Sequence, residues 1–85
     1  MPLFLVERQF ADALEVTAAD VTQIQRINTD VGVNWVFSFL SADRKKTYCL
    51  YEAPNAEAIR QAARLANLPA DAVIEVTQMG PEAFA

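Results

Sequence analysis

Residues 33–53 read VNWVFSFLSADRKKTYCLYEA, and this stretch decides the fold. Aromatic and β-branched residues fill both of its ends, which is typical of β-strands. The segment between them, Asp43-Arg44-Lys45, is short, polar and turn-like. We therefore predict two antiparallel strands, residues 33–42 and 46–53, joined as a hairpin.

One helix is predicted on each side of this hairpin. Residues 17–31 place apolar side chains at helical spacing, with Thr17 suited to cap the first turn. Gly32 follows, where the left-handed conformation that ends many helices costs least. The second helix is predicted to begin after its cap Asn55 and to end at Asn67, which tolerates the same conformation.

Two further strands, one near each end of the chain, complete the pattern. Residues 3–9 alternate and begin apolar on both faces, and residues 71–79 carry a second β-branched run. The order βαββαβ predicts an α+β ferredoxin-like fold, with a four-stranded antiparallel sheet, two helices on one face and strands one and three at the centre. We expect one domain over residues 1–80 and a C-terminal tail over residues 81–85.

Composition narrows the classes of function. The chain has 85 residues, 53% of them apolar, which excludes a disordered chain and a multidomain enzyme. Seven basic residues stand against eleven acidic ones, so a nucleic-acid partner is not expected. No apolar run has the length of a membrane span. The lone Cys49 cannot form an intrachain disulfide and is expected as a small buried hydrophobe, which favours the reducing cytoplasm.

The chain also resembles a known family. Three stretches carry the resemblance: Pro2 to Arg8, Phe39 to Pro54, and Leu68-Pro69-Ala70-Asp71 with the strand after it. Together they span about residues 2–79 and are similar to a family of small bacterial proteins of unknown function, typified by a nickel-responsive, nickel-binding protein of actinobacteria.

The resemblance implies a ferredoxin-like fold and a homodimer. It also implies nickel ligation by histidines at the positions that Phe37 and Ala62 occupy here. This chain has no histidine, and imidazole is the natural nitrogen ligand for nickel. We therefore expect nickel to bind weakly or not at all, and leave open a divalent metal ion of another kind or a small molecule.

Three glutamates are the candidate metal ligands. We expect strands one and three to run parallel, so that Glu7 and Glu52 end them at the same level and Glu75, early in strand four, joins them. Converging carboxylates suit a hard cation or a shared proton. The alternative is that all three lie solvated at the rim of the sheet or pair with arginine.

An aromatic stripe is the second candidate site. Trp35, Phe37 and Phe39 alternate along strand two and should share one face, with Tyr48 on the neighbouring strand. Because strands one to three are apolar on both faces, the sheet needs a second layer opposite its helices. A second copy of the chain would supply it, so we expect a homodimer through the sheet face. Ordinary core packing is the alternative for the stripe.

Three hypotheses of function remain. The first is a small cytoplasmic dimeric binding protein. The second is a cofactor-free monooxygenase or isomerase of the dimeric ferredoxin-like type, with Glu7, Glu52 and Tyr48 as acid–base groups. The third is an assembly module with no ligand.

Overall fold

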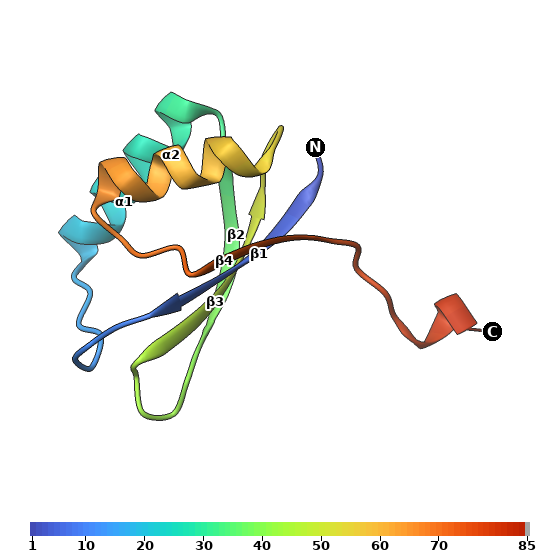
Figure 1. The fold of residues 1–85 in the computed structure, drawn as a ribbon, viewed down its shortest axis with the longest axis horizontal. Helices are drawn as coiled ribbons and strands as arrows, with labels where there is room; N and C mark the ends of the chain where they lie inside the picture. The colour runs from blue at the N-terminus through green and yellow to red at the C-terminus, as the bar shows by residue number, and fades with distance from the viewer. Residues whose placement is uncertain (85) are drawn as a thin grey trace.

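The computed structural model describes residues 1–84 (Figure 1). Four strands and two helices alternate as predicted, and a short 3-10 helix follows them. The elements are β1 (Leu3–Gln9), α1 (Ala18–Val31), β2 (Asn34–Leu40), β3 (Lys46–Glu52), α2 (Ala56–Ala66), β4 (Ala72–Val76) and η1 (Pro81–Phe84).

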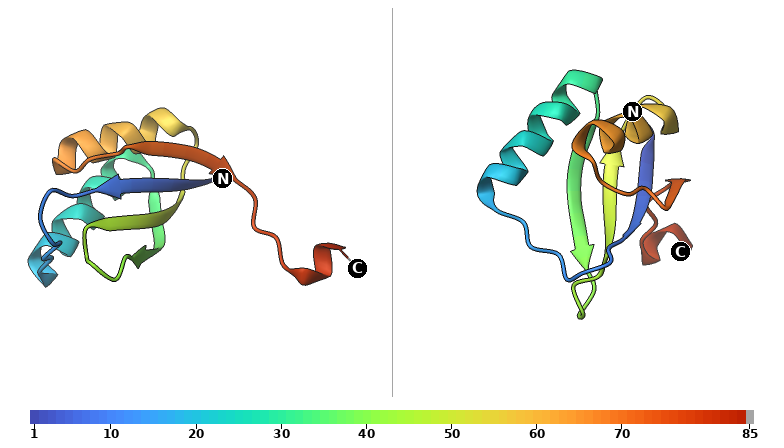
Figure 2. Two further views of the ribbon diagram at one scale, coloured as in Figure 1. Left: turned by 60° about the horizontal axis from the view of Figure 1, so that its bottom comes forward. Right: turned by 60° about the vertical axis from the view of Figure 1, so that its left-hand side comes forward.

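The four strands form one antiparallel sheet in the order β2-β3-β1-β4. Both helices lie on the same side of it (Figure 2). This is the ferredoxin-like α+β arrangement expected from the sequence, with β1 and β3 at the centre. We call the side under the helices the helix face and the other side the open face.

The expected parallel direction of strands one and three is wrong. β1 and β3 are antiparallel, with Leu3 opposite Glu52 and Glu7 opposite Tyr48. The reason lies in the crossover: helix α1 returns the chain so that β2 runs parallel to β1, and the hairpin then reverses β3 between them.

Local signals fix both ends of both helices. Thr17 and Asp20 form a capping box, in which each side chain accepts from the other residue's backbone N–H at 3.2 and 3.0 Å. The Asn55 side chain accepts from the backbone N–H of Ala58 at 2.9 Å. Gly32 and Asn67 end the helices in the left-handed conformation, as predicted.

The core lies between the helix face and α2. Val6 and Ile59 are its largest fully buried side chains, and Phe4, Cys49 and Tyr51 pack with them. Cys49 is free and buried, as expected. The alanines of α2 allow this helix to lie close to the sheet, because Ala62 and Ala63 are themselves buried.

A β-bulge divides the predicted aromatic stripe. The pairing of β2 with β3 shifts by one residue between Trp35 and Phe37, so Trp35 lies opposite Tyr51 on the helix face and Phe37 opposite Leu50 on the open face. An extra residue reverses the alternation beyond it. The expectation that Trp35 shares a face with Phe37 and Phe39 is therefore wrong.

The chain leaves the sheet after β4. Residues 77–84 extend away from the body and end in η1 (Figure 1). Part of the predicted tail, Ala85, lies outside the described residues. Within residues 1–84 no helix is long and apolar enough to span a membrane.

Candidate functional site

The main candidate site is a cavity of about 330 Å³ between the first half of α1, the segment before it and the helix face. We call it the α1 cavity. Thirteen residues line it: Arg8, Phe10, Leu14, Val16, Val21, Ile24, Trp35, Ser38, Leu40, Thr47, Cys49, Tyr51 and Leu68. Most of this wall is apolar, which is typical of small-molecule sites.

The cavity exists because α1 packs against the body chiefly through its C-terminal half. Asn28 is the buried residue of α1, whereas Val21 and Ile24 in its first turns are half-buried. Figure 2 shows the N-terminal end of α1 leaning away from the sheet. The long segment between β1 and α1 closes part of the space with Phe10, Leu14 and Val16.

Hydrogen bonds hold that segment to the turn between β2 and β3. The Leu14 backbone N–H donates to the carbonyl of Arg44 at 2.7 Å, and the Arg44 guanidinium donates back to the Leu14 carbonyl at 2.9 and 3.2 Å. Arg44 has a φ of 63°, a left-handed backbone conformation that is unfavourable for any residue with a Cβ atom. The turn thus positions one wall of the cavity.

Arg8 brings a positive charge to the cavity. It alternates with Phe4 and Val6 along β1, so it faces the helices, and only 4% of its surface is exposed. Its guanidinium donates from Nη1 to the Pro69 carbonyl at 2.9 Å and from Nη2 to the Tyr51 hydroxyl at 3.1 Å. Both acceptors are neutral, so neither compensates the charge.

Tyr51 and Asn28 extend this polar end of the site. Burial raises the pKa of the Tyr51 phenol, and the Arg8 charge offsets part of the rise, so the hydroxyl is neutral at physiological pH. Asn28 is 3% exposed, and its Nδ2 is buried without a hydrogen-bond partner. A small inner hollow adjoining the α1 cavity is lined by Asn28, Arg8 and Tyr51 together.

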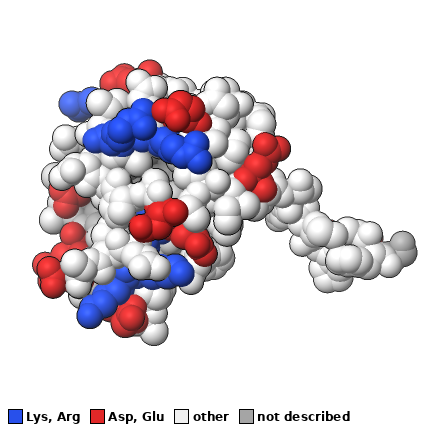
Figure 3. Space-filling model, in the orientation of Figure 1, with Lys and Arg blue, Asp and Glu red and all other residues white. Residues whose placement is uncertain are grey.

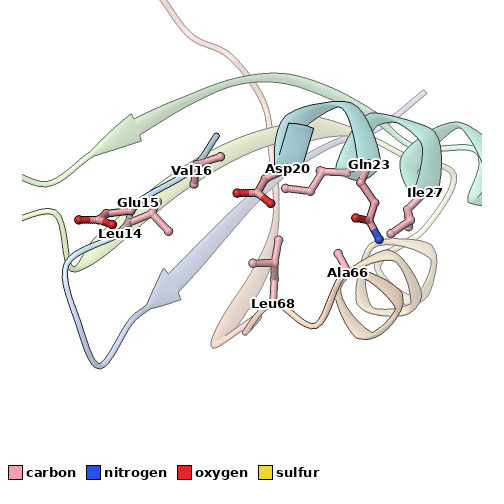
Figure 4. A pocket seen from close by; sticks show the side chains of 9 residues that line it. Leu14, Glu15, Val16, Asp20, Gln23, Ile27, Ala66 and Leu68 are labelled. Carbon is pink, nitrogen blue, oxygen red and sulfur yellow. The ribbon is translucent and has the colours of Figure 1, made fainter. Parts of the chain in front are cut away.

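A second, smaller hollow lies between the same segment, α1 and the end of α2. Its volume is about 200 Å³, and Figure 4 shows Leu14, Glu15 and Val16 on one side of it, with Ala66 at the end of α2 and Leu68 just after it below. Asp20, Gln23, Ile24 and Ile27 of α1 complete its wall. The backbone N–H of Thr17 holds the pKa of Asp20 below its usual range, so this carboxylate serves the helix cap.

The open face of the sheet is apolar and exposed. Phe37 and Phe39 stand on it 48% and 64% exposed, with their rings packed edge to face, and Ile74 of β4 is 48% exposed. Register places Leu5 and Leu50 between them on the two central strands. This continuous patch is larger than scattered surface hydrophobics would produce.

The three predicted metal ligands do not converge. Glu7 and Glu52 share the open face, but their positions lie four residues apart along β1, about 13 Å. Glu75 lies opposite Phe4 and therefore on the other face. Glu52 instead accepts from Asn34 Nδ2 at 2.7 Å. Across residues 1–84 no three histidine, cysteine or acidic side chains lie close enough to hold a metal ion.

The expected acid–base groups lie away from the α1 cavity. Glu7 is directly opposite Tyr48 on the open face, and Lys46 stacks over the Tyr48 ring at 5.1 Å. Of the predicted aromatic site, Phe37 and Tyr48 remain on the open face, whereas Trp35 lines the cavity and donates to Ser38 Oγ at 2.7 Å.

The charged surface has no dominant sign on the side that Figure 3 shows. Acidic and basic side chains are interspersed there, over the helices and along the sheet edge. The arrangement agrees with the modest net charge of −4.

Comparison with known proteins identifies the family. Residues 4–76 match the family described as "Nickel responsive protein SCO4226-like", and the chain belongs to it. The crystal structure of SCO4226 from Streptomyces coelicolor A3(2) has the same fold, with a TM-score of 0.70 and 22% sequence identity over 92% of this chain and 99% of that one. No match was found among curated proteins.

Sequence reasoning missed the α1 cavity and the role of Arg8. One signal was present: Arg8 falls on the inward side of a strand whose other inward residues are Phe4 and Val6. A charged residue at such a position is rarely buried without a partner. The cavity itself depends on the tilt of α1, which no residue pattern encodes.

Proposed function

We propose that the chain is the subunit of a small dimeric binding protein that takes a small-molecule ligand in the α1 cavity. The observation that carries the proposal is the cavity itself, an apolar space of about 330 Å³ with one buried charge on its wall. Ligand sites in proteins occupy about 300–1,000 Å³ and share this composition. The free, buried Cys49 suits the reducing cytoplasm as its compartment.

The open face supports the dimer. Phe37, Phe39 and Ile74 would be shielded from water if a second copy placed the same face against them. A two-fold axis that lies between the two sheets and parallel to them pairs such a patch with itself. The helix face and the α1 cavity stay outside this contact.

Nickel does not fit the residues of this chain. The family name points to nickel, but the chain has no histidine, and the buried Cys49 donates to Thr47 Oγ1 at 3.6 Å rather than facing acidic side chains. Oxygen ligands alone suit Mg²⁺, Ca²⁺ or Mn²⁺ better than nickel. The proposed ligand is therefore organic.

A neutral fluorescent probe tests the cavity. N-phenyl-1-naphthylamine should gain fluorescence on binding, and energy transfer from Trp35, the only tryptophan, would locate it at the cavity wall. Val21→Phe should weaken binding at least about tenfold, because the larger side chain fills the space.

Gln25→Phe is the matched control, since it makes a similar change on an exposed position of the same helix. It should bind the probe like the wild type. Absence of probe binding to the wild type, or equal loss in both variants, would show that the cavity is not a ligand site.

A further inference from the structure

We infer that the ligand of the α1 cavity is a small organic acid: one carboxylate, received by Arg8, on an apolar body that fills the rest of the space. This inference rests on the proposed function and names the chemical class of its ligand.

Arg8 is a buried cation without an anionic partner in residues 1–84. Only one salt bridge joins side chains there, between Arg64 and Glu57 on the surface of α2. No acidic residue is among those that line the α1 cavity or its inner hollow. Burying an unpaired charge is costly, so the position is best explained by an anion that arrives with a ligand.

The neighbours of Arg8 are also hydrogen-bond donors. Guanidinium has five N–H bonds, and Arg8 uses its two terminal nitrogens for one hydrogen bond each. The Asn28 Nδ2 group is buried and unpartnered beside the same inner hollow. The neutral Tyr51 hydroxyl accepts from Arg8, which leaves its own proton to donate. Arg8 and Tyr51 therefore present donors to the α1 cavity without an anionic acceptor, which suits a carboxylate, and Asn28 lies behind them in the inner hollow.

The remaining walls limit what the carboxylate can be attached to. Phe10, Leu14, Val21, Ile24, Leu40 and Leu68 surround the space. A phosphate or a sugar acid would leave its other polar groups facing these side chains, which is unfavourable. An aromatic or branched aliphatic monocarboxylic acid satisfies both the polar end and the apolar walls.

A matched pair of probes tests the inference on the wild-type protein. We expect 4-tert-butylbenzoate to bind at least about tenfold more tightly than 4-tert-butylbenzamide in calorimetric titration, because a hydrogen bond to a charged group is stronger than one to a neutral amide. The two compounds have the same shape, so the difference reports the charge. Inorganic phosphate should not compete with the benzoate at millimolar concentration.

Arg8→Met supplies the matched variant. It should lose the preference for the acid while it still binds the amide, because the apolar walls are unchanged. The wild-type comparison stands even if this variant does not fold.

The outcomes separate the two proposals. If the acid and the amide bind the wild type equally, the cavity is a ligand site but the organic-acid inference is wrong. If neither compound binds and the neutral probe also fails, the proposed function is wrong as well. Competition by phosphate would show an anion site without a requirement for the apolar body, and would also overturn the inference.

Discussion

Tyr51 is a single residue that belongs both to the core and to the candidate site. Its ring packs in the core, its hydroxyl accepts from Arg8, and the Arg8 guanidinium lies 5.7 Å from the ring centre. Burial raises the pKa of its phenol despite this nearby positive charge. The folded state therefore holds the phenolic proton more strongly than the unfolded state does.

A pH prediction follows from this raised pKa. The contribution of Tyr51 to stability is fully present below the unfolded pKa of about 10 and is lost as pH rises through the higher folded value. The stability advantage of the wild type over Tyr51→Phe should therefore shrink above about pH 10. Melting curves between neutral and strongly alkaline pH check this. Tyr48→Phe removes the other phenol and is the control; an advantage that stays constant with pH would contradict the prediction.

Trp35 is the residue whose face of the sheet is predicted wrongly from the residue pattern. Strict alternation over residues 33–42 placed it with Phe37 and Phe39, but the bulge reversed its side. The same bulge brings Trp35 Nε1 within 2.7 Å of Ser38 Oγ, three residues along. A bulge depends on how two strands pair, and the sequence of one strand does not reveal it.

At the scale of elements the sequence was most informative. Both N-caps, both left-handed ends and the hairpin were predicted from local residue chemistry, because capping and turns are decided by a few neighbouring residues. Strand ends were less certain: the strand predicted over residues 33–42 is Asn34–Leu40, and that predicted over residues 71–79 is Ala72–Val76.

Removing the N-cap of α2 should lower the stability of the protein by a measurable amount. Asn55→Ala leaves the backbone N–H of Ala58 without its acceptor and should lower the free energy of unfolding by about 1 kcal/mol. For a domain of this size the melting temperature should fall by about 4–8 °C. Asn55→Asp keeps an acceptor and should stay close to the wild type. Equal losses in the two variants would mean that the side-chain oxygen does not cap α2.

In the molecule as a whole, the relative direction of β1 and β3 determines whether the three predicted metal ligands meet. The prediction that the three glutamates meet requires β1 and β3 to run parallel, and their antiparallel pairing separates the glutamates instead. The α1 cavity cannot be predicted from the sequence for a related reason, since it depends on the position of α1 relative to the sheet. The separation of the glutamates and the α1 cavity both depend on how the helices and strands are placed in three dimensions. Hydrophobic periodicity and helix- or strand-ending residues describe only one element at a time.

The dimer can be tested through the open face. Phe39→Glu places a charge where 64% of the native side chain is exposed on the apolar patch. We expect the wild type to sediment as a dimer at tens of micromolar and this variant as a monomer, because a buried unpaired carboxylate is costly at an interface.

Leu65→Glu is the matched control for the dimer, since Leu65 is similarly exposed but lies on α2. It should leave the sedimentation coefficient unchanged. A monomeric wild type would contradict the proposed assembly outright. A dimer that survives Phe39→Glu would place the interface elsewhere on the molecule.

Nickel binding is the property on which the family name and the residues of this chain diverge most. The resemblance implies histidines at the positions of Phe37 and Ala62. In this fold Phe37 stands exposed on the open face, whereas Ala62 is a residue of α2 that is buried on the helix side of the sheet. The two positions lie on opposite sides of one sheet, so a single subunit could not use both for one ion.

We therefore expect calorimetric titration of the tag-free wild type with nickel to show no tight site. Phe37→His is the comparison variant, because it places one imidazole on the open face without disturbing the core between the sheet and α2. It should bind nickel more tightly than the wild type, since imidazole is a far better nickel ligand than the phenyl ring it replaces. Tight binding by the wild type would mean that oxygen and sulfur ligands suffice, and the argument from the missing histidine would fail.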